Sequence, residues 1–205
     1  MAYASPSSTR ARGRPRRAAA RQAIVDATVA LLAERGFRAT TMDAIAARAG
    51  VGKNTIYRRW SSKEELVTDA LAELTAPLLE TSDGADAYAR LLDRAGNNAR
   101  TFADPVVGRI LPDLLGELQR NRAFAVVFAE RILNPRRQAV VDDIRREMER
   151  GELRPNLDPD HVADLLVGPQ LLRLLLPYAG SYSVAEYPAE LLDTIWNGIA
   201  PVRRA

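Results

Sequence analysis

The chain has 205 residues, of which 47% are apolar, and its formal net charge is +3. This length and composition are typical of a globular protein with one or two hydrophobic cores and exclude a disordered chain. It contains no run of 18 or more apolar residues, and no apolar segment follows its first arginines, so we expect no membrane span, no secretory signal and a cytoplasmic location. The absence of cysteine excludes disulfides, thiol catalysis and cysteine-based metal sites.

The charges are distributed unevenly along the chain. Residues 1–63 contain thirteen Lys and Arg but three acidic residues, whereas the remainder contains sixteen basic and twenty-three acidic residues. The first segment therefore carries +10 and the rest carries −7. A basic segment of this kind is typical of a surface that meets the phosphate backbone of nucleic acid, and the acidic remainder would be repelled by it.

The start of the chain is rich in arginine. TRARGRPRRAAAR, residues 9–21, contains six arginines between small residues, and we expect residues 1–17 to form a disordered basic arm. Three interpretations of this arm stay open: a solvated tail without a function, a nuclear localisation signal, and an arm whose Arg14, Arg16 and Arg17 enter the minor groove of DNA. The RGRP core also resembles an AT-hook, but a four-residue match arises often by chance.

Apolar residues recur at helical spacing almost throughout the chain and strand signals are nearly absent, which predicts an all-α fold. The first helix spans RQAIVDATVALLAERGF and ends near Gly36. Thr41 precedes a second short helix, MDAIAARA, and is a suitable N-cap for it. After a turn at Gly50, GKNTIYRRW predicts a third short helix whose Ile56 and Trp60 face inward.

A fourth helix follows and ends near residue 80. Ser61 and Glu64 have the S-x-x-E spacing of a capping box at its start. The remaining chain, 81–205, contains six further helical segments bounded by Pro, Gly or Asn, and Asp158-Pro159-Asp160 is a clear helix start. The expected helical segments are GADAYARLLDRAGNNARTF, PVVGRILPDLLGELQ, RAFAVVFAERIL, PRRQAVVDDIRREMERGEL, DPDHVADLLVGPQLLRLLLPY and AEYPAELLDTIWNGI.

The second and third helices and the turn between them predict a helix-turn-helix. Lys53, Asn54, Tyr57 and Arg58 lie on the outer faces of the third helix, where they could bond base edges and phosphates in the major groove. This pattern alone is weak, since many small all-α proteins contain it. Its position in the +10 segment, after the arginine arm, strengthens it.

The run GFRATTMDAIAARAGVGKNTIYRRWSSKEELV, with the helix before it, resembles the DNA-binding domain of the TetR family of transcriptional regulators over residues 18–78. The resemblance implies a three-helix DNA-binding head at residues 18–64, a larger helical domain at 81–205, a homodimer, and a bacterial repressor that leaves a palindromic double-stranded operator when a small molecule binds. It implies no cofactor. Where family members commonly have Ser after Gly-Val, this chain has Gly52, which weakens the cap of the third helix, and it has Asn54 where a small residue is frequent.

The resemblance also implies the residues that contact DNA. Those on or beside the third helix would bond base edges or phosphate, and Thr41 and Lys63, at the starts of the second and fourth helices, would hold phosphate oxygens. The full set is Thr41, Lys53, Asn54, Thr55, Tyr57, Arg58, Arg59 and Lys63, with Arg14, Arg16 and Arg17 of the arm.

RGELRPNLDPDHVADLLVGPQLLRLL resembles the ligand-binding and dimerisation domain of the same family, more loosely. In that family the last two helices of each subunit form the dimer interface, for which the candidates here are Leu165, Leu166, Leu172, Leu175, Leu192, Ile195 and Trp196. Candidates for a pocket that takes an apolar or aromatic effector are Phe102, Phe124, Phe128 and Tyr178, with Arg173, Arg109, Asp113 or Glu117 as polar anchors. Any one of these residues is more often plain core or surface.

Other classes of protein fit less well. An enzyme needs convergent nucleophile, base and oxyanion groups, and the chain has no cysteine, one histidine and no glycine-rich phosphate loop, so we expect no enzyme and no catalytic residues. His161 stands near Asp158 and Asp160, but one histidine next to helix-capping acids does not predict a metal site. A membrane-surface protein would show a broad apolar helix face opposite Lys and Arg, which the short third helix lacks.

Overall fold

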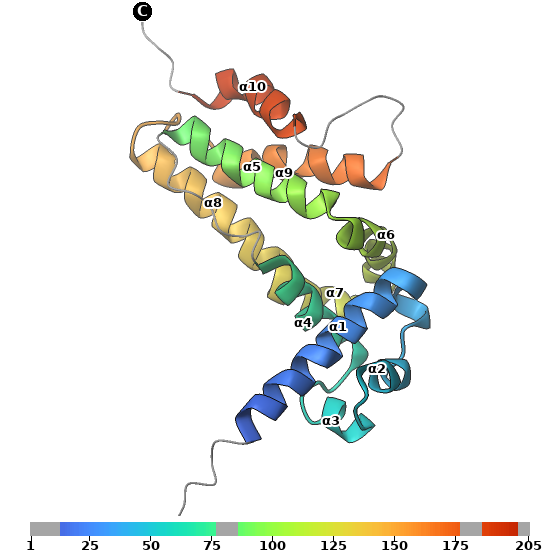
Figure 1. The fold of residues 1–205 in the computed structure, drawn as a ribbon. Coiled ribbons are helices and arrows are strands. Elements are labelled where there is room, and N and C mark those ends of the chain that lie inside the picture. Colours follow the sequence, from blue (N-terminus) through green and yellow to red (C-terminus); the bar gives the residue numbers. More distant parts are fainter. Residues whose placement is uncertain (1–12, 77–85, 177–185, 201–205) are drawn as a thin grey trace, which may run out of the picture. The chain divides into compact units, whose positions relative to one another are not determined.

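A computed structural model describes residues 13–76, 86–176 and 186–200 of the chain (Figure 1). All regular elements in these ranges are helices, which confirms the predicted all-α class. The chain divides into two compact units, residues 1–70 and 71–205, which we call the head and the helical domain. The unit boundary falls inside one helix, α4 (Lys63–Thr75).

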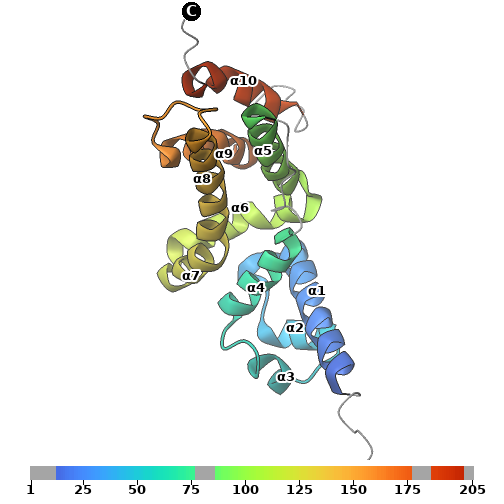
Figure 2. The ribbon, with the colours of Figure 1, turned by 90° about the vertical axis from the view of Figure 1, so that its left-hand side faces the viewer.

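The head is built on a long first helix. α1 (Gly13–Ala39) packs against α2 (Met42–Ala49), and α2 contacts α3 (Lys53–Tyr57) after a tight turn (Figures 1 and 2). α1 begins inside the expected disordered arm, so the prediction is wrong for residues 13–17, which are helical. The alanines at 18–20 favour helix, and Pro15 is tolerated because it lies in the first turn, where no intrahelical N–H bond is lost.

One apolar cluster holds the helices of the head together. Ile24 and Leu31 of α1, Ile45 of α2 and Ile56 of α3 are at most 2% exposed and pack with Trp60 and Leu66. The indole Nε1 of Trp60 donates to the Asp69 carboxylate at 2.9 Å, so this large side chain is buried with its polar atom satisfied. The inward positions predicted for Ile56 and Trp60 are therefore confirmed.

Turns and caps in the head follow from single residues. The regular helix of α1 is interrupted at Gly36, which has φ 73° and ψ 176°, a conformation that a residue with a Cβ adopts rarely. The capping box of α4 lies one residue later than predicted, because Ser62 Oγ accepts from Glu65 N at 3.1 Å. The Glu65 carboxylate accepts from the N–H and hydroxyl of Ser61, both at 2.8 Å.

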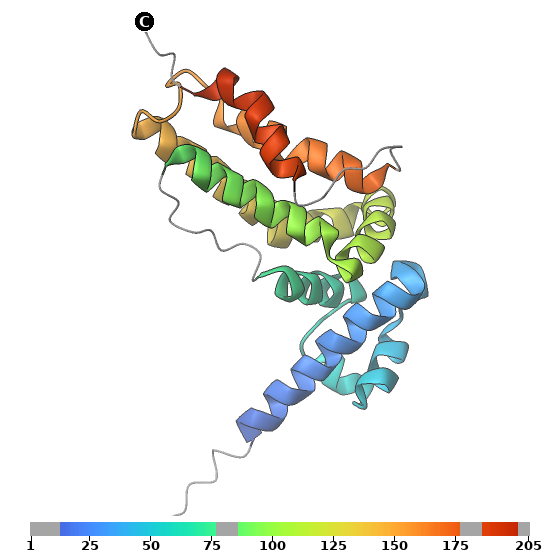
Figure 3. The same ribbon diagram turned by 45° about the horizontal axis from the view of Figure 1, so that its top comes forward.

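The helical domain consists of long helices packed side by side, with shorter ones at one end (Figure 3). α5 packs against α8, α9 and α10, while α6 contacts α5, α7 and α9. Its core joins Leu91 of α5, Ile144 of α8, Leu166 of α9 and Leu192 of α10, all at most 2% exposed. The bounds are α5 Ala87–Ala103, α6 Pro105–Arg120, α7 Arg122–Phe128, η2 (a π-helical turn) Ala129–Leu133, α8 Asn134–Glu149, α9 Pro159–Leu175 and α10 Tyr187–Ile199.

Two prolines in this domain do not interrupt the helices in which they lie. We expected a break before Pro135, but the residues at both ends of η2 have helical dihedrals, so α7, η2 and α8 follow one another without a loop. A proline inside a helix commonly kinks or breaks it, yet α9 continues through Gly168 and Pro169. The predicted start of α9 is confirmed, since the Asp158 carboxylate caps Asp160 N and Pro159 occupies the first turn.

Candidate DNA interface and pocket

The turn between α2 and α3 aims one short helix outward. The Thr41 hydroxyl accepts from Ala44 N at 3.1 Å and caps α2, and Gly50 ends α2 with φ 65°, the left-handed conformation that suits glycine. Val51 N then bonds Ala46 O at 3.1 Å, which closes the turn. Three residues therefore separate the end of α2 from the start of α3, as in a helix-turn-helix.

The two sides of α3 differ in chemistry. Ile56 is fully buried, whereas its neighbour Tyr57 is 52% exposed. Lys53 and Asn54 are exposed as well, and Thr55 is half-buried. Arg58 and Arg59, directly after α3, are exposed. α3 and the two residues after it thus expose five of the eleven side chains expected to contact DNA: one ammonium, two guanidinium groups, one carboxamide and one phenol.

The two lysines expected to contact DNA, Lys53 and Lys63, have intramolecular partners. Lys53 Nζ lies 2.6 Å from the Asp43 carboxylate, in a pair with both side chains more than half exposed. Lys63 is less available than predicted, because its Nζ donates to Phe37 O at 2.9 Å and lies 4.0 Å from the centroid of the Phe37 ring. Lys63 thus fastens the start of α4 to the end of α1, a role that the sequence did not indicate.

The structure also connects the end of the arm to the region after α3. Arg59 Nη2 donates to the carbonyl oxygen of Arg17 at 3.4 Å, and the Arg17 side chain is exposed. Arg14 and Arg16 belong to the first turn of α1, but their side chains lie outside the described part of the chain. Arg48 of α2 pairs with Glu34 of α1 at 2.6 Å, a bond that lowers the pKa of Glu34 and raises the pKa of Arg48.

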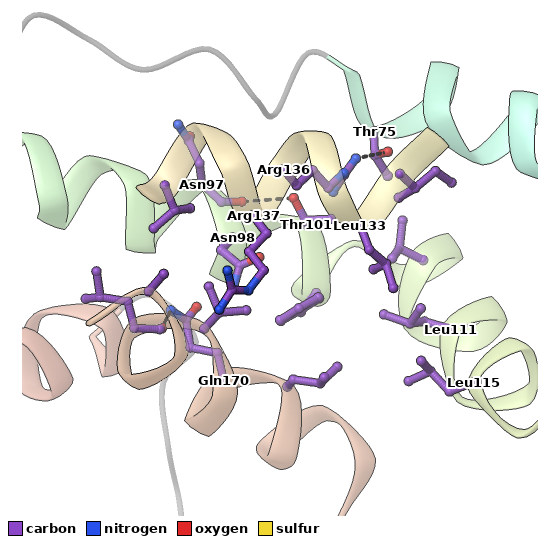
Figure 4. A pocket seen from close by; sticks show the side chains of 18 of the residues that line it. Thr75, Asn97, Asn98, Thr101, Leu111, Leu115, Leu133, Arg136, Arg137 and Gln170 are labelled. Atoms are coloured by element: carbon purple, nitrogen blue, oxygen red, sulfur yellow. Dashed lines mark hydrogen bonds between the residues drawn. The ribbon is translucent and has the colours of Figure 1, made fainter. Parts of the chain in front are cut away.

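The helical domain contains a cavity of about 340 Å³ (Figure 4). Most of its wall is apolar, with side chains from α5, α6, η2, α8 and α9. Among these are Val107, Ile110, Leu114, Ile132 and Leu166, each buried. Ligand sites in proteins are commonly cavities of this size with apolar walls and a few polar groups, so the cavity is a candidate binding site.

Polar groups enter the cavity from several helices. The Arg136 guanidinium of α8 donates to Thr75 Oγ1, and burial lowers the pKa of Arg136 (Figure 4). Arg137 pairs with Asp160 and with Asp164, the latter at 3.1 Å. The hydrogen bond between Arg137 and Asp160 raises the pKa of the guanidinium and lowers the pKa of the carboxyl group. Arg94 of α5 pairs with Asp143 at 2.6 Å, so two of the three arginines in the wall are neutralised.

The residues expected to form a pocket are only partly brought together. Phe102 and Phe128 line the cavity. Phe124 is fully buried and packs edge-on against Phe128, with 6.0 Å between ring centroids, and is not among the described lining residues. The Arg173 guanidinium lies 4.4 Å from the centroid of the Tyr187 ring, also outside the described lining, and Tyr178 lies outside the described residues. The suggested anchors Arg109, Asp113 and Glu117 are likewise absent from the described lining.

Sequence reasoning missed the polar residues that do line the cavity, above all Asn98 and Gln170. The available signals were the Asn97-Asn98 pair inside an amphipathic helix and the single Gln170 in the apolar run GPQLLRLLL.

The expected interface residues fall into two groups. Leu166 and Leu192 are 2% and 0% exposed inside the core, so the prediction that they contact a second subunit is wrong. Ile195 and Trp196 are half-buried against the same core, with Trp196 edge-on to Tyr88. On the other side of α9, Leu165, Leu172 and Leu175 are 49%, 47% and 40% exposed, at helical spacings of seven and three. Leu176 continues this apolar face at 46% exposure.

The described ranges provide neither a membrane-spanning helix nor a metal site. No helix there has both the length and the apolar character needed to cross a bilayer. The same ranges contain no group of three His, Asp or Glu side chains placed to hold a metal ion. His161 is 81% exposed, with Nδ1 3.5 Å from a carboxylate oxygen of the helix cap Asp158.

Comparison with known proteins agrees with this architecture in both units. Residues 24–70 match the family described as bacterial regulatory proteins, tetR family, and residues 81–195 match the tetracyclin repressor-like C-terminal domain. The HTH-type transcriptional regulator YdeS of Bacillus subtilis is 34% identical over 188 residues, which cover 92% of this chain and 93% of that protein.

Two solved structures share the fold. The TetR family transcription regulator SCO0332 matches with 27% identity and a TM-score of 0.70, covering 89% of this chain and 99% of that one. FadR of Bacillus subtilis, solved in complex with stearoyl-CoA, has a TM-score of 0.72 at 20% identity, over 86% and 98% of the two chains.

The helix-turn-helix and the family match define the chain as a DNA-binding transcriptional regulator. The chain belongs to the TetR family of transcriptional regulators.

Proposed function

We propose that the protein is a repressor that binds a palindromic operator through α3 and leaves it when a small molecule fills the cavity of the helical domain. The observation that carries this proposal is the division of α3 into a fully buried anchor, Ile56, and an exposed face with Lys53, Asn54 and Tyr57. A helix that reads DNA must be held rigidly on one side and present hydrogen-bonding groups on the other.

Each exposed group has a suitable partner on DNA. Arg58 and Arg59 carry planar guanidinium groups that bond guanine N7 and O6 or two phosphate oxygens. The Asn54 carboxamide matches adenine N6 and N7, and the Tyr57 hydroxyl matches phosphate oxygen. Thr41 adds a phosphate contact at the N-terminus of α2, because its hydroxyl accepts from Ala44 N and keeps its own proton to donate.

The arm would add affinity without base specificity. Arg14, Arg16 and Arg17 lie at the start of α1, and arginines of a basic N-terminal segment can enter the minor groove where it is narrow. Lys63 would contribute a phosphate contact only by exchanging its bond to Phe37 O.

A homodimer is favoured by the exposed face of α9. Leu165, Leu172 and Leu175 form an apolar row on this helix, and Gly168 lies between them, where an added Cβ would meet nothing within 4 Å. Apolar rows left exposed on a folded chain commonly mark an interface, and the glycine permits close approach of a second helix. A two-fold dimer presents two heads to half-sites one helical turn, roughly 34 Å, or a multiple of it apart.

The effector role of the cavity is supported by its size and by its apolar wall. FadR of Bacillus subtilis, which shares this fold, was solved in complex with stearoyl-CoA, and this supports a ligand-binding role for the helical domain. DNA binding and the absence of a suitable span in the described helices fit a cytoplasmic regulator.

The test is a selection of bound duplexes from a random DNA pool by the purified full chain at about 150 mM salt. A palindromic consensus supports the proposal and gives the half-site spacing. Enrichment of a single asymmetric site would reject the dimeric operator. Binding without a consensus would reject the repressor and make the arginine arm the main contact of a nonspecific, architectural DNA binder.

A further inference from the structure

One atom of the Gln170 side chain on α9 is buried in the cavity wall without a hydrogen-bond partner. Gln170 is 5% exposed, and its Nε2 donates to Leu166 O at 2.7 Å. Only the NH₂ end of a carboxamide can donate to a carbonyl, so the other end must be the oxygen. This Oε1 atom is buried and accepts no hydrogen bond. The cavity therefore contains a fixed, unused acceptor.

A second carboxamide supplies the complementary group. Asn98 of α5 also lines the cavity, and its Nδ2 is buried without a partner (Figure 4). Leaving a buried donor or acceptor unpaired costs roughly 1–3 kcal/mol, and native proteins contain few such groups. Two of them on separate helices facing one cavity indicate a ligand that satisfies both.

The arginine side chains of the cavity wall, unlike these two carboxamide atoms, have partners within the protein. Arg94 is paired with Asp143, and Arg137 with Asp164. Arg136 bonds Thr75, and its nitrogens are not among the buried unpartnered atoms found in the described residues. The two buried atoms without a partner in the described cavity wall, Gln170 Oε1 and Asn98 Nδ2, thus both belong to neutral carboxamides.

The volume limits the size of the ligand. A dry cavity of about 150 Å³ accepts benzene, so about 340 Å³ has room for roughly a dozen non-hydrogen atoms. The remaining wall, including Ile110, Leu114 and Phe128, matches an apolar body.

We propose that the effector is a compact, uncharged, largely apolar molecule with a hydroxyl group that donates to Gln170 Oε1 and accepts from Asn98 Nδ2. A hydroxyl satisfies both because it is one donor with two lone pairs. This inference rests on the proposed function, in which the cavity is the effector site.

The test compares three ring compounds of one shape by calorimetric titration of the full chain. The probes are naphthol, naphthalene and naphthoate, and we expect naphthol to bind at least about tenfold more tightly than either of the others, because a site built to bond a hydroxyl discriminates against its absence. Binding of none of them, or a preference for naphthalene or naphthoate, would overturn the proposal.

Variants assign the selectivity to the two carboxamides. In Gln170→Leu and in Asn98→Leu the preference for naphthol over naphthalene should fall toward one, while retained naphthalene binding shows that the cavity is still folded. Gln138→Leu removes a glutamine from the exposed surface of α8, outside the described lining, and should keep the wild-type preference. An unchanged preference in both cavity variants would contradict the assignment.

A DNA readout separates this inference from the proposed function. Naphthol at saturation is added to the protein on the duplex recovered by selection. Hydroxyl-selective binding without release of DNA would leave the ligand class intact and reject induced release. Release by naphthoate or naphthalene at lower concentration than by naphthol would keep the regulator and reject the ligand class.

Discussion

Tyr57 and Ile56 are neighbours in α3, but truncation of Ile56 should lower the stability of the head and truncation of Tyr57 should lower its affinity for DNA. Ile56 is fully buried, and replacing a buried isoleucine by alanine costs about 2–5 kcal/mol. The head, at roughly 0.05–0.15 kcal/mol per residue, has a free energy of unfolding of about 3.5–10.5 kcal/mol. Ile56→Ala therefore removes a large part of the stability of the head. Tyr57 is 52% exposed, so Tyr57→Ala should change stability by no more than about 0.5 kcal/mol.

Affinity for DNA should depend on the exposed Tyr57 side chain. Tyr57→Ala should weaken binding to the selected duplex by about 1–3 kcal/mol per head, or roughly 5- to 150-fold, without loss of folded protein. The assay is fluorescence anisotropy at fixed salt, with amide hydrogen exchange of residues 42–60 as the stability readout. Wild-type affinity in Tyr57→Ala, or unchanged exchange in Ile56→Ala, would refute the assignment of the two faces of α3.

Three further substitutions test other parts of the structure. Gly52 is the N-cap of α3 and makes no side-chain capping bond. Its φ of −71° and ψ of 144° suit any residue, and an added Cβ would meet nothing within 4 Å, so Gly52→Ser should raise the free energy of unfolding by about 0.5–1 kcal/mol in a thermal melt. A lower melting temperature of this variant would contradict the assignment of Gly52 as the cap. Asp43→Asn removes the anion that pairs with Lys53 and should strengthen DNA binding several-fold in anisotropy titrations, whereas Asp26→Asn on the exposed side of α1 should not. Leu172→Glu places a charge in the exposed row of α9 and should yield a monomer by sedimentation at micromolar concentration; a persisting dimer would place the interface elsewhere.

The head could be predicted from sequence because its signals are local. A capping threonine, a glycine at φ 65° and inward residues four apart determine α2, the turn and α3, and all lie within about twenty residues. The errors are equally local: Ser61 and Ser62 are both possible caps, and only the bond from Glu65 N to Ser62 Oγ decides between them.

The interface and the cavity were harder to predict because they depend on contacts between distant segments. α9 carries leucine on two sides, so its periodicity cannot tell that Leu166 enters the core while Leu165 remains 49% exposed. Aromatic residues were favoured for the pocket, yet Phe124 packs behind Phe128 and carboxamides supply the polar groups. Gln170 of α9 lines the same cavity as Asn98 of α5, which lies some seventy residues earlier in the chain. The pattern of a single segment cannot predict that two such distant side chains share a cavity.

The central claim, sequence-specific DNA binding by the head, is tested most directly by competition on the selected duplex. Labelled selected duplex and a scrambled duplex of the same composition are titrated with the full chain in excess nonspecific competitor DNA, at salt concentrations from about 50 to 200 mM. We expect the selected duplex to stay bound under competitor, with affinity that falls steeply as salt rises, and the scrambled duplex to be displaced. Equal displacement of both duplexes would contradict the account.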